Sequence, residues 1–200
     1  AVTDVARYDV FKLGEAVLAG QVARALKMLD GLQAEGEAAV LVHWTLAEDI
    51  RALKRIKDAI AHNKFVLAGQ PIVDTRSRQT SAYEILIRLR DEHGTLIMPS
   101  GFLPAAERFG LSADIDRWVI VNAIRLLAEQ RRESPGLRYS INLSGQTLSE
   151  PAICNLVIHE LRRTSLDPSA LTFEVTETVA IANMVLAETF LARLQEIGCS

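Results

Sequence analysis

The stretch from Tyr83 to Leu89 constrains the fold of this chain more than any other. β-Branched and aromatic residues crowd into it, which is typical of a β-strand. Side chains alternate between the two faces of a strand, so one face is largely apolar and the other carries Glu84 and Arg88. A carboxylate and a guanidinium on the inner face of a covered strand are costly unless they are paired or bind something. The stretch therefore predicts a strand that contributes to a polar site.

Three other stretches repeat this alternation, and each places one oxygen-bearing side chain on a single face. These side chains are Gln70 in residues 66–73, Asn142 in residues 137–144 and Glu174 in residues 171–176. Hard cations such as magnesium or calcium prefer oxygen ligands of this kind. For any one strand, a solvated or edge-exposed face is the simpler interpretation. Four such strands in series, counting the one with Glu84, favour one shared polar site.

The order of the predicted elements indicates an α/β fold. A turn over residues 74–81 would join the first two strands as an antiparallel hairpin. Helices and strands alternate from residue 137 onward, which implies parallel strands with right-handed crossovers. The spacing suits a TIM-like (βα) barrel, but a complete barrel needs about 250 residues. We therefore expect an incomplete TIM-like barrel with an antiparallel first strand, preceded by an α-helical segment.

The helical segment covers residues 4–60, with a break at Gly20 and a turn over residues 35–37. Helical spacing places Trp44 in the core of this segment. Further helices are expected over residues 102–109, from about residue 112 to 133, from about 149 to 164 and over 183–197.

Single residues at the predicted helix starts have structural roles. Ser112 or Asp114 can cap the long helix, and Ser149 can cap the helix that follows the third strand. Asp114 and Asp116 lie near a helix start, where carboxylates interact favourably with the helix dipole. None of these residues is therefore predicted to belong to a site.

Composition excludes several classes of protein. The net charge of −3 gives no indication of a basic surface that would bind nucleic acid. No apolar run is long enough for a membrane span. Cys154 and Cys199 form no CxxC pair and indicate reduced thiols, which predicts a cytoplasmic location. The start at Ala1 and the end at Ser200 are those expected of an excised piece of a longer protein.

Five ordered motifs resemble those of the EAL-domain family, the bacterial cyclic di-GMP phosphodiesterases. They are QPIV at 70–73, YEILIR at 83–88, FLPAAE at 102–107, INLS at 141–144 and FEVTE at 173–177. Ile85 stands where the family name has alanine. The resemblance covers roughly residues 52–200, and five motifs in order make it specific.

The resemblance implies a TIM-like barrel with a reversed first strand and a site for a divalent ion, magnesium or manganese. The implied metal ligands are Glu84, Asn142 and Glu174. Arg88 would touch a substrate phosphate, Gln70 would line the nucleotide pocket, and Glu177 would shape the loop near the site. Glu107 is interpreted as a surface or structural residue of its helix.

The sequence departs from the family's pattern, because the further acidic, lysine and glutamine residues of that pattern would lie beyond Ser200. Two-metal cleavage of a phosphodiester needs ligands for both ions. We therefore expect a fragment of a cyclic di-GMP phosphodiesterase that does not hydrolyse its substrate as given. The alternatives are a non-catalytic module that binds cyclic di-GMP or a partner, and a scaffold without a selected function.

The helical segment has a resemblance of its own, to the delta subunit of the bacterial DNA polymerase III clamp loader. It rests on residues 8–13, 23–26, 32–37 and 46–51. With it, the chain divides into a delta-like segment (1–55) and a truncated EAL-type half-barrel (56–200), which makes the chain a chimera. An incomplete barrel leaves strand edges open, so we also expect a homo-oligomer.

Overall fold

The computed structural model describes residues 9–182 and 184–200. The chain divides into two compact units, one ending at Lys57 and one spanning Asp58–Ser200. The predicted start of the last helix at residue 183 lies outside the described residues. Each unit is considered by itself.

The first unit is helical, as predicted. It contains α1 (Val10–Leu18), α2 (Val22–Ala34) and most of α3 (Ala39–Ala61). Asp9 caps α1 by accepting a hydrogen bond from the backbone N–H of Phe11 at 2.8 Å. Gly20 and Gly36 adopt the left-handed backbone conformation between the helices, with φ of +68° and +81°. The two predicted breaks are thus confirmed.

A small apolar core holds these helices together. Its buried members are Leu13, Ala16, Ala25, Met28, Leu32 and Val42. The prediction that Trp44 belongs to this core is wrong, because its side chain is 60% exposed. Trp44 follows Val42 by two residues, which is about 200° around a helix, so the two side chains point to opposite sides.

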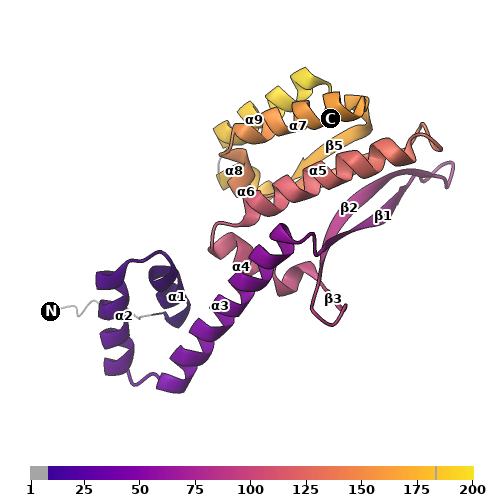
Figure 1. The fold of residues 1–200 in the computed structure, drawn as a ribbon. Coiled ribbons are helices and arrows are strands. Elements are labelled where there is room, and N and C mark those ends of the chain that lie inside the picture. Colours follow the sequence, from indigo (N-terminus) through magenta and orange to yellow (C-terminus); the bar gives the residue numbers. More distant parts are fainter. Residues whose placement is uncertain (1–8, 183) are drawn as a thin grey trace. The chain divides into compact units, whose positions relative to one another are not determined.

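The second unit is built on one mixed sheet, shown in Figure 1. Among the described residues the sheet has five strands in the order β1-β2-β4-β5, with β3 paired to β2. The strands are β1 (Phe65–Val73), β2 (Thr80–Arg90), β3 (Leu96–Ile97), β4 (Tyr139–Leu143) and β5 (Leu171–Val175). β1 and β2 are antiparallel, whereas β2, β4 and β5 run parallel. The predicted hairpin and parallel order are confirmed.

β3 was not predicted. Its two residues pair with Leu89 and Arg90 after a turn in which the Asp91 carboxylate accepts hydrogen bonds from two backbone N–H groups. Two residues are too few to show an alternating pattern, so the sequence carries no signal for this strand.

The helices of the second unit connect the strands. They are the 3₁₀ turns η1 (Pro99–Gly101) and η2 (Pro168–Ala170), and the helices α4 (Leu103–Arg108), α5 (Ser112–Gln130), α6 (Gly145–Leu148), α7 (Ala152–Thr164), α8 (Glu177–Ala182) and α9 (Met184–Ile197). α5 packs against β4 and α7. Within the described residues, none of the helices combines the length and the apolar character that a membrane crossing requires.

The predicted caps are wrong in both cases. Leu111, not Ser112 or Asp114, occupies the cap position of α5 and makes no side-chain cap bond. Ser149 lies at the end of α6, and α7 begins after Pro151. The sequence could not reveal the short helix α6, which separates Ser149 from the helix it was expected to cap.

The apolar face of the sheet and the inner face of α5 form the core of the second unit. Ile85, Ile141 and Phe173 are buried on the strands, and Ile120 and Ile124 are buried on α5. Each such side chain contributes about 1.5–3 kcal/mol when it is fully buried. The opposite face of the strands is the polar one, so the alternation in the sequence orients the sheet.

Both cysteines are free and buried. Burial raises the pKa of the Cys199 thiol to about 11 and also raises the pKa of Cys154. Both side chains are therefore uncharged thiols at neutral pH, as expected of core residues. The cytoplasmic location remains a prediction.

The last residue lies along β5. The Ser200 N–H donates to the carbonyl of Leu171 at 3.0 Å, and its carbonyl accepts from the Phe173 N–H at 2.8 Å. Ser200 is therefore hydrogen-bonded in the way that a residue opposite Thr172 on a parallel neighbouring strand would be.

Candidate functional site

The strand register places the predicted polar side chains on one face of the sheet. Gln70 lies opposite Glu84 in the β1–β2 ladder, and Asn142 lies opposite Glu174 in the β4–β5 ladder. Glu84 is in turn opposite Ser140, two residues before Asn142. Residues directly opposite each other share a face, and so do residues two apart. The four predicted side chains therefore lie on a common surface.

Two contacts connect these side chains across strands. The Asn142 Nδ2 donates a hydrogen bond to Glu84 Oε1 at 2.7 Å. The Ser140 hydroxyl donates to the Glu174 carboxylate. Asn142 and Glu174 are exposed and Glu84 is half-buried, so all three are accessible to a ligand. The first contact joins Glu84 to Asn142, and the register places Glu174 opposite Asn142 on the same face, so the two carboxylates and the amide form one polar cluster.

The donor chemistry of this cluster fits a hard divalent cation. Two carboxylates and an amide carbonyl are all oxygen donors, which magnesium and manganese accept. Among the described residues, no group of three or more His, Cys, Asp or Glu side chains could hold a metal ion. An amide ligand is therefore needed alongside the two carboxylates, and Asn142 lies between them.

Arg88 shares the face of Glu84 but lies four residues further along β2, which is about 13 Å. Its Nη1 donates to the backbone carbonyl of Ile87 at 2.8 Å. The structure therefore does not bring Arg88 into contact with Glu84. Glu177 begins α8 directly after Thr176, and its role in shaping the loop remains a prediction.

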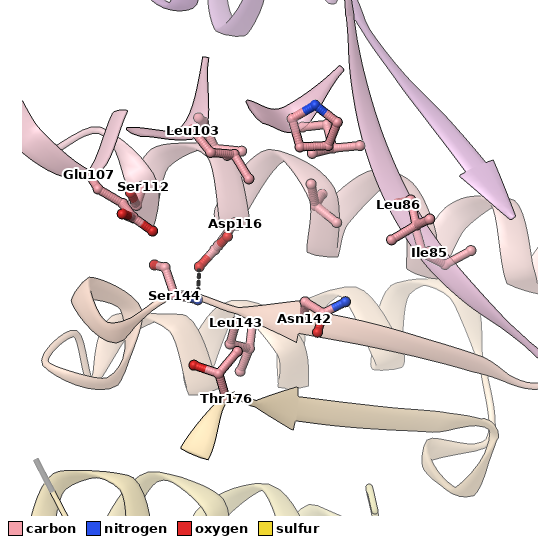
Figure 2. Close-up of a pocket in the computed structure, with 14 residues that line it drawn as sticks. Ile85, Leu86, Leu103, Glu107, Ser112, Asp116, Asn142, Leu143, Ser144 and Thr176 are labelled. Carbon is pink, nitrogen blue, oxygen red and sulfur yellow. Dashed lines mark hydrogen bonds between the residues drawn. The ribbon is translucent and has the colours of Figure 1, made fainter. Parts of the chain in front are cut away.

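A pocket of about 270 Å³ lies next to the polar cluster (Figure 2). The register pairs of β2 and β4 end at Ile85 and Ile141, and the pocket opens beyond them. Its lining is mainly apolar, with polar groups at intervals. The lining residues are Ile85, Leu86, Ile87, Pro99, Leu103, Glu107, Ser112, Ile115, Asp116, Val119, Asn142, Leu143, Ser144 and Thr176. Asn142 and Leu86 belong both to the pocket and to the polar face, so the two are continuous.

Asp116 is a pocket residue that sequence reasoning missed. Its carboxylate is buried and accepts hydrogen bonds from the Ser144 N–H at 2.7 Å and the Thr147 hydroxyl at 2.6 Å. Burial raises its pKa above the ordinary 3.8, although both hydrogen bonds act to lower it. The helix-dipole interpretation therefore does not account for Asp116, although Asp114 does lie in the first turn of α5. A signal existed, because Asp116 falls on the apolar stripe of α5 that includes Val119 and Ala123.

Glu107, interpreted from the sequence as a surface or structural helix residue, also lines the pocket. Figure 2 shows its carboxylate beside Ser112 at one end of the pocket. It lies in the last turn of α4 and is exposed. An exposed glutamate on a short helix carries no sequence signal of its own, and only the packing of α4 against the neighbouring elements reveals its place.

Comparisons with known proteins agree with these features. The sequence model of the EAL domain family matches residues 53–200. The cyclic di-GMP phosphodiesterase PdeF of Escherichia coli (strain K12) is 35% identical over 187 residues, which cover 94% of this chain and 24% of PdeF. The chain thus spans about a quarter of the length of this relative.

Solved structures give the same result. The FimX EAL domain from Pseudomonas aeruginosa, bound to c-di-GMP, is 31% identical with a TM-score of 0.68, covering 74% of this chain and 60% of that chain. The phosphodiesterase PaMucR, in a c-di-GMP complex, is 29% identical with a TM-score of 0.70, covering 75% and 61%. The predicted α/β fold, part of a TIM-like barrel, is confirmed.

The resemblance of the helical segment to the clamp-loader delta subunit is not shown by these comparisons. The match with PdeF takes in 94% of the chain and therefore most of residues 1–55 as well. The comparisons consequently do not favour the interpretation of the chain as a chimera.

Proposed function

The chain belongs to the EAL-domain family of cyclic di-GMP phosphodiesterases, and on this premise we propose that its polar face binds a divalent metal ion and cyclic di-GMP. The observation that carries the proposal is the contact between Asn142 and Glu84 on the same face as Glu174. This cluster offers oxygen ligands beside a pocket large enough for part of a nucleotide.

Glu84, Asn142 and Glu174 would hold the ion, which is magnesium or manganese. When bound, such an ion polarises a phosphoryl oxygen and stabilises the charge that develops on it. Holding the Asn142 amide against Glu84 restricts the orientation of both side chains before any ion arrives. The Ser140 hydroxyl does the same for Glu174.

The remaining predicted residues would bind the nucleotide. Arg88 carries a positive charge on this face of β2 and suits a phosphate, and Gln70 borders the cluster from β1. The pocket has apolar walls that suit a flat base. The Glu107 carboxylate at its edge can accept hydrogen bonds from ring N–H and amino groups, such as the N2 amino group of guanine. Two of the similar structures were solved with c-di-GMP bound.

Binding and hydrolysis are separate expectations for these 200 residues. The cluster offers one group of three oxygen ligands, which suits one ion, whereas two-metal hydrolysis needs ligands for a second ion about 3.5–4 Å away. We therefore expect the chain to bind cyclic di-GMP in the presence of magnesium without turning it over.

The test is calorimetric titration of the chain with cyclic di-GMP in magnesium, with the product analysed after long incubation. Replacing the Glu84 carboxylate by an amide, in Glu84→Gln, should weaken binding about tenfold, or ~1.4 kcal/mol, because the ion loses a charged ligand. Glu133→Gln, which removes a carboxylate from the turn after α5, is the matched control. Equal affinity for the two variants would contradict the proposal, and released linear dinucleotide would contradict the expected inactivity.

A further inference from the structure

One side chain, that of Gln146 in α6, joins two helices at the wall of the pocket. Its Oε1 accepts a hydrogen bond from the Ser112 N–H at 3.1 Å, and its Nε2 donates to the Glu107 carbonyl at 2.7 Å. Ser112 is the first residue of α5, and Glu107 lies in the last turn of α4. Backbone groups at helix ends lack partners within the helix. One amide therefore supplies an acceptor at the start of α5 and a second donor to a carbonyl at the end of α4.

The corner between α4 and α5 is first shaped by its own backbone. Gly110 has a φ of +70°, the Leu111 N–H donates to the Ala106 carbonyl at 2.8 Å, and the Gly110 N–H donates to the Glu107 carbonyl. These bonds form a Schellman motif, which closes the turn. They do not connect the corner to the end of β4. Gln146 makes that connection, because α6 follows directly from the loop after β4.

Ser112 provides an independent observation. Its side chain lines the pocket and the residue is only 3% exposed. Its Oγ is buried and has no hydrogen-bond partner among the residues that the structure describes. A buried hydroxyl without a partner is costly, so such a group in a folded protein needs an explanation. A polar group of a ligand in the pocket would provide the missing partner.

We infer that Gln146 is a positioning residue, which holds the corner at residues 107–112 so that the Ser112 hydroxyl meets a polar group of the bound nucleotide. The inference rests on the proposed function, because cyclic di-GMP is the ligand. Asp116 ties the loop after β4 to α5 independently, through the Ser144 N–H and the Thr147 hydroxyl. The loop should therefore stay in place when Gln146 is replaced, and only the corner should loosen.

A double-mutant cycle on the whole chain tests this inference. Calorimetric titration with cyclic di-GMP in magnesium is performed on the unsubstituted chain, Ser112→Ala, Gln146→Ala and the double variant. Each single substitution should weaken binding about tenfold, the expected effect of one lost hydrogen bond. The double variant should bind no more weakly than either single variant, because Gln146 acts through Ser112. Gln195→Ala, which shortens an exposed glutamine of α9, is the control and should bind as the unsubstituted chain does.

The outcomes separate the inference from the function on which it rests. No binding by the unsubstituted chain overturns the proposed function and the inference with it. Binding by that chain with unchanged affinity in Ser112→Ala overturns the inference alone. If the fold-loss of affinity in the double variant equals the product of the two single losses, the positioning role of Gln146 is overturned. Thermal unfolding checks that each variant is folded, and Gln146→Glu, which keeps the acceptor for the Ser112 N–H, replaces Gln146→Ala if that variant does not fold.

Discussion

A buried carboxylate such as that of Asp116 loses hydration and gains two hydrogen bonds in exchange. One donor is the Ser144 N–H and the other is the fully buried Thr147 hydroxyl. Without the carboxylate, the Ser144 N–H would lose its acceptor, and the Thr147 hydroxyl would keep only its longer contact with the Ser144 hydroxyl at 3.3 Å. A buried donor without a partner costs about 1–3 kcal/mol, so the acceptor at this position matters more than its charge.

Two substitutions separate the acceptor from the charge. Asp116→Ala should lower the free energy of unfolding by about 1–3 kcal/mol, because the Ser144 N–H loses its acceptor and the Thr147 hydroxyl loses its shorter hydrogen bond. Asp116→Asn keeps an acceptor and should be much less destabilising. Because the folded-state pKa of Asp116 is raised, ionisation of this group destabilises the fold at neutral pH, and that cost disappears as the pH falls through the folded pKa towards 3.8.

The free energy of unfolding of Asp116→Asn, relative to that of the unsubstituted chain, should therefore be highest at neutral pH. It should fall as the pH is lowered. Urea unfolding at several pH values measures both effects. Equal destabilisation by Asn and Ala would show that the acceptor is unimportant.

A residue of the site could be predicted from the sequence only where its place does not depend on partners far away in the chain. Glu84, Asn142 and Glu174 could be found because strand alternation assigns each to a face without knowledge of any partner. Gln146 could not, because its role depends on partners 34 and 39 residues away in the chain. The place of Asp116 on an apolar stripe is visible in the sequence, but its partner 28 residues away is not. Ser112 is a candidate cap in the sequence because local sequence decides most caps. Here the partner of its N–H comes from another helix.

Between elements, one buried glutamate connects α5 and α7 of the second unit. Glu160 in α7 is 3% exposed and accepts hydrogen bonds from Arg125 in α5 and from Arg163 one turn further along α7. Burial alone would raise the pKa of Glu160. The hydrogen bonds from Arg163 and Arg125 outweigh that effect, so the pKa lies below the ordinary 4.5.

A lowered folded-state pKa means that this group stabilises the protein above pH 4.5 and that the contribution is lost as the pH falls through the folded pKa. Glu160→Gln should lower the free energy of unfolding by about 2 kcal/mol at pH 7, because hydrogen bonds to charged groups contribute more than neutral ones. The difference should shrink in acid. Glu129→Gln on the exposed face of α5 is the control, and urea unfolding at pH 7 and pH 3 is the measurement. A pH-independent loss would refute the ionic contribution.

The extent to which elements could be predicted follows from their length. β1, β2 and α5 are long enough for a period to be visible, and their positions were predicted closely. β3 and α6 have two and four residues, which is less than a period can reveal. The error at Ser149 adjoins α6, one of these short elements.

At the scale of the whole chain, the exposed edge of the sheet should govern behaviour in solution. Among the described residues, β1 pairs only with β2, and it ends in Ile72 and Val73, which are 40% and 48% exposed. Open apolar edges recruit further strands, and charged residues prevent this. We expect the chain to self-associate as its concentration rises.

Ile72→Lys should reduce this association. Ile181→Lys, which places the same charge on an exposed isoleucine of α8, should not. Sedimentation velocity across a range of concentrations distinguishes the two variants. A monomer at every concentration for the unsubstituted chain would disprove the expectation.

The pairing of Ser200 with β5 also fixes what any strand continuing along that edge would bring to the site. Ser200 lies opposite Thr172, so the position two residues further on would lie opposite Glu174, with its side chain on the same face. The charge of the side chain at that position would change the local electric field around the carboxylates of Glu84 and Glu174. The affinity of the polar face for the proposed cation would then depend on a residue of the neighbouring strand as well as on the three proposed ligands.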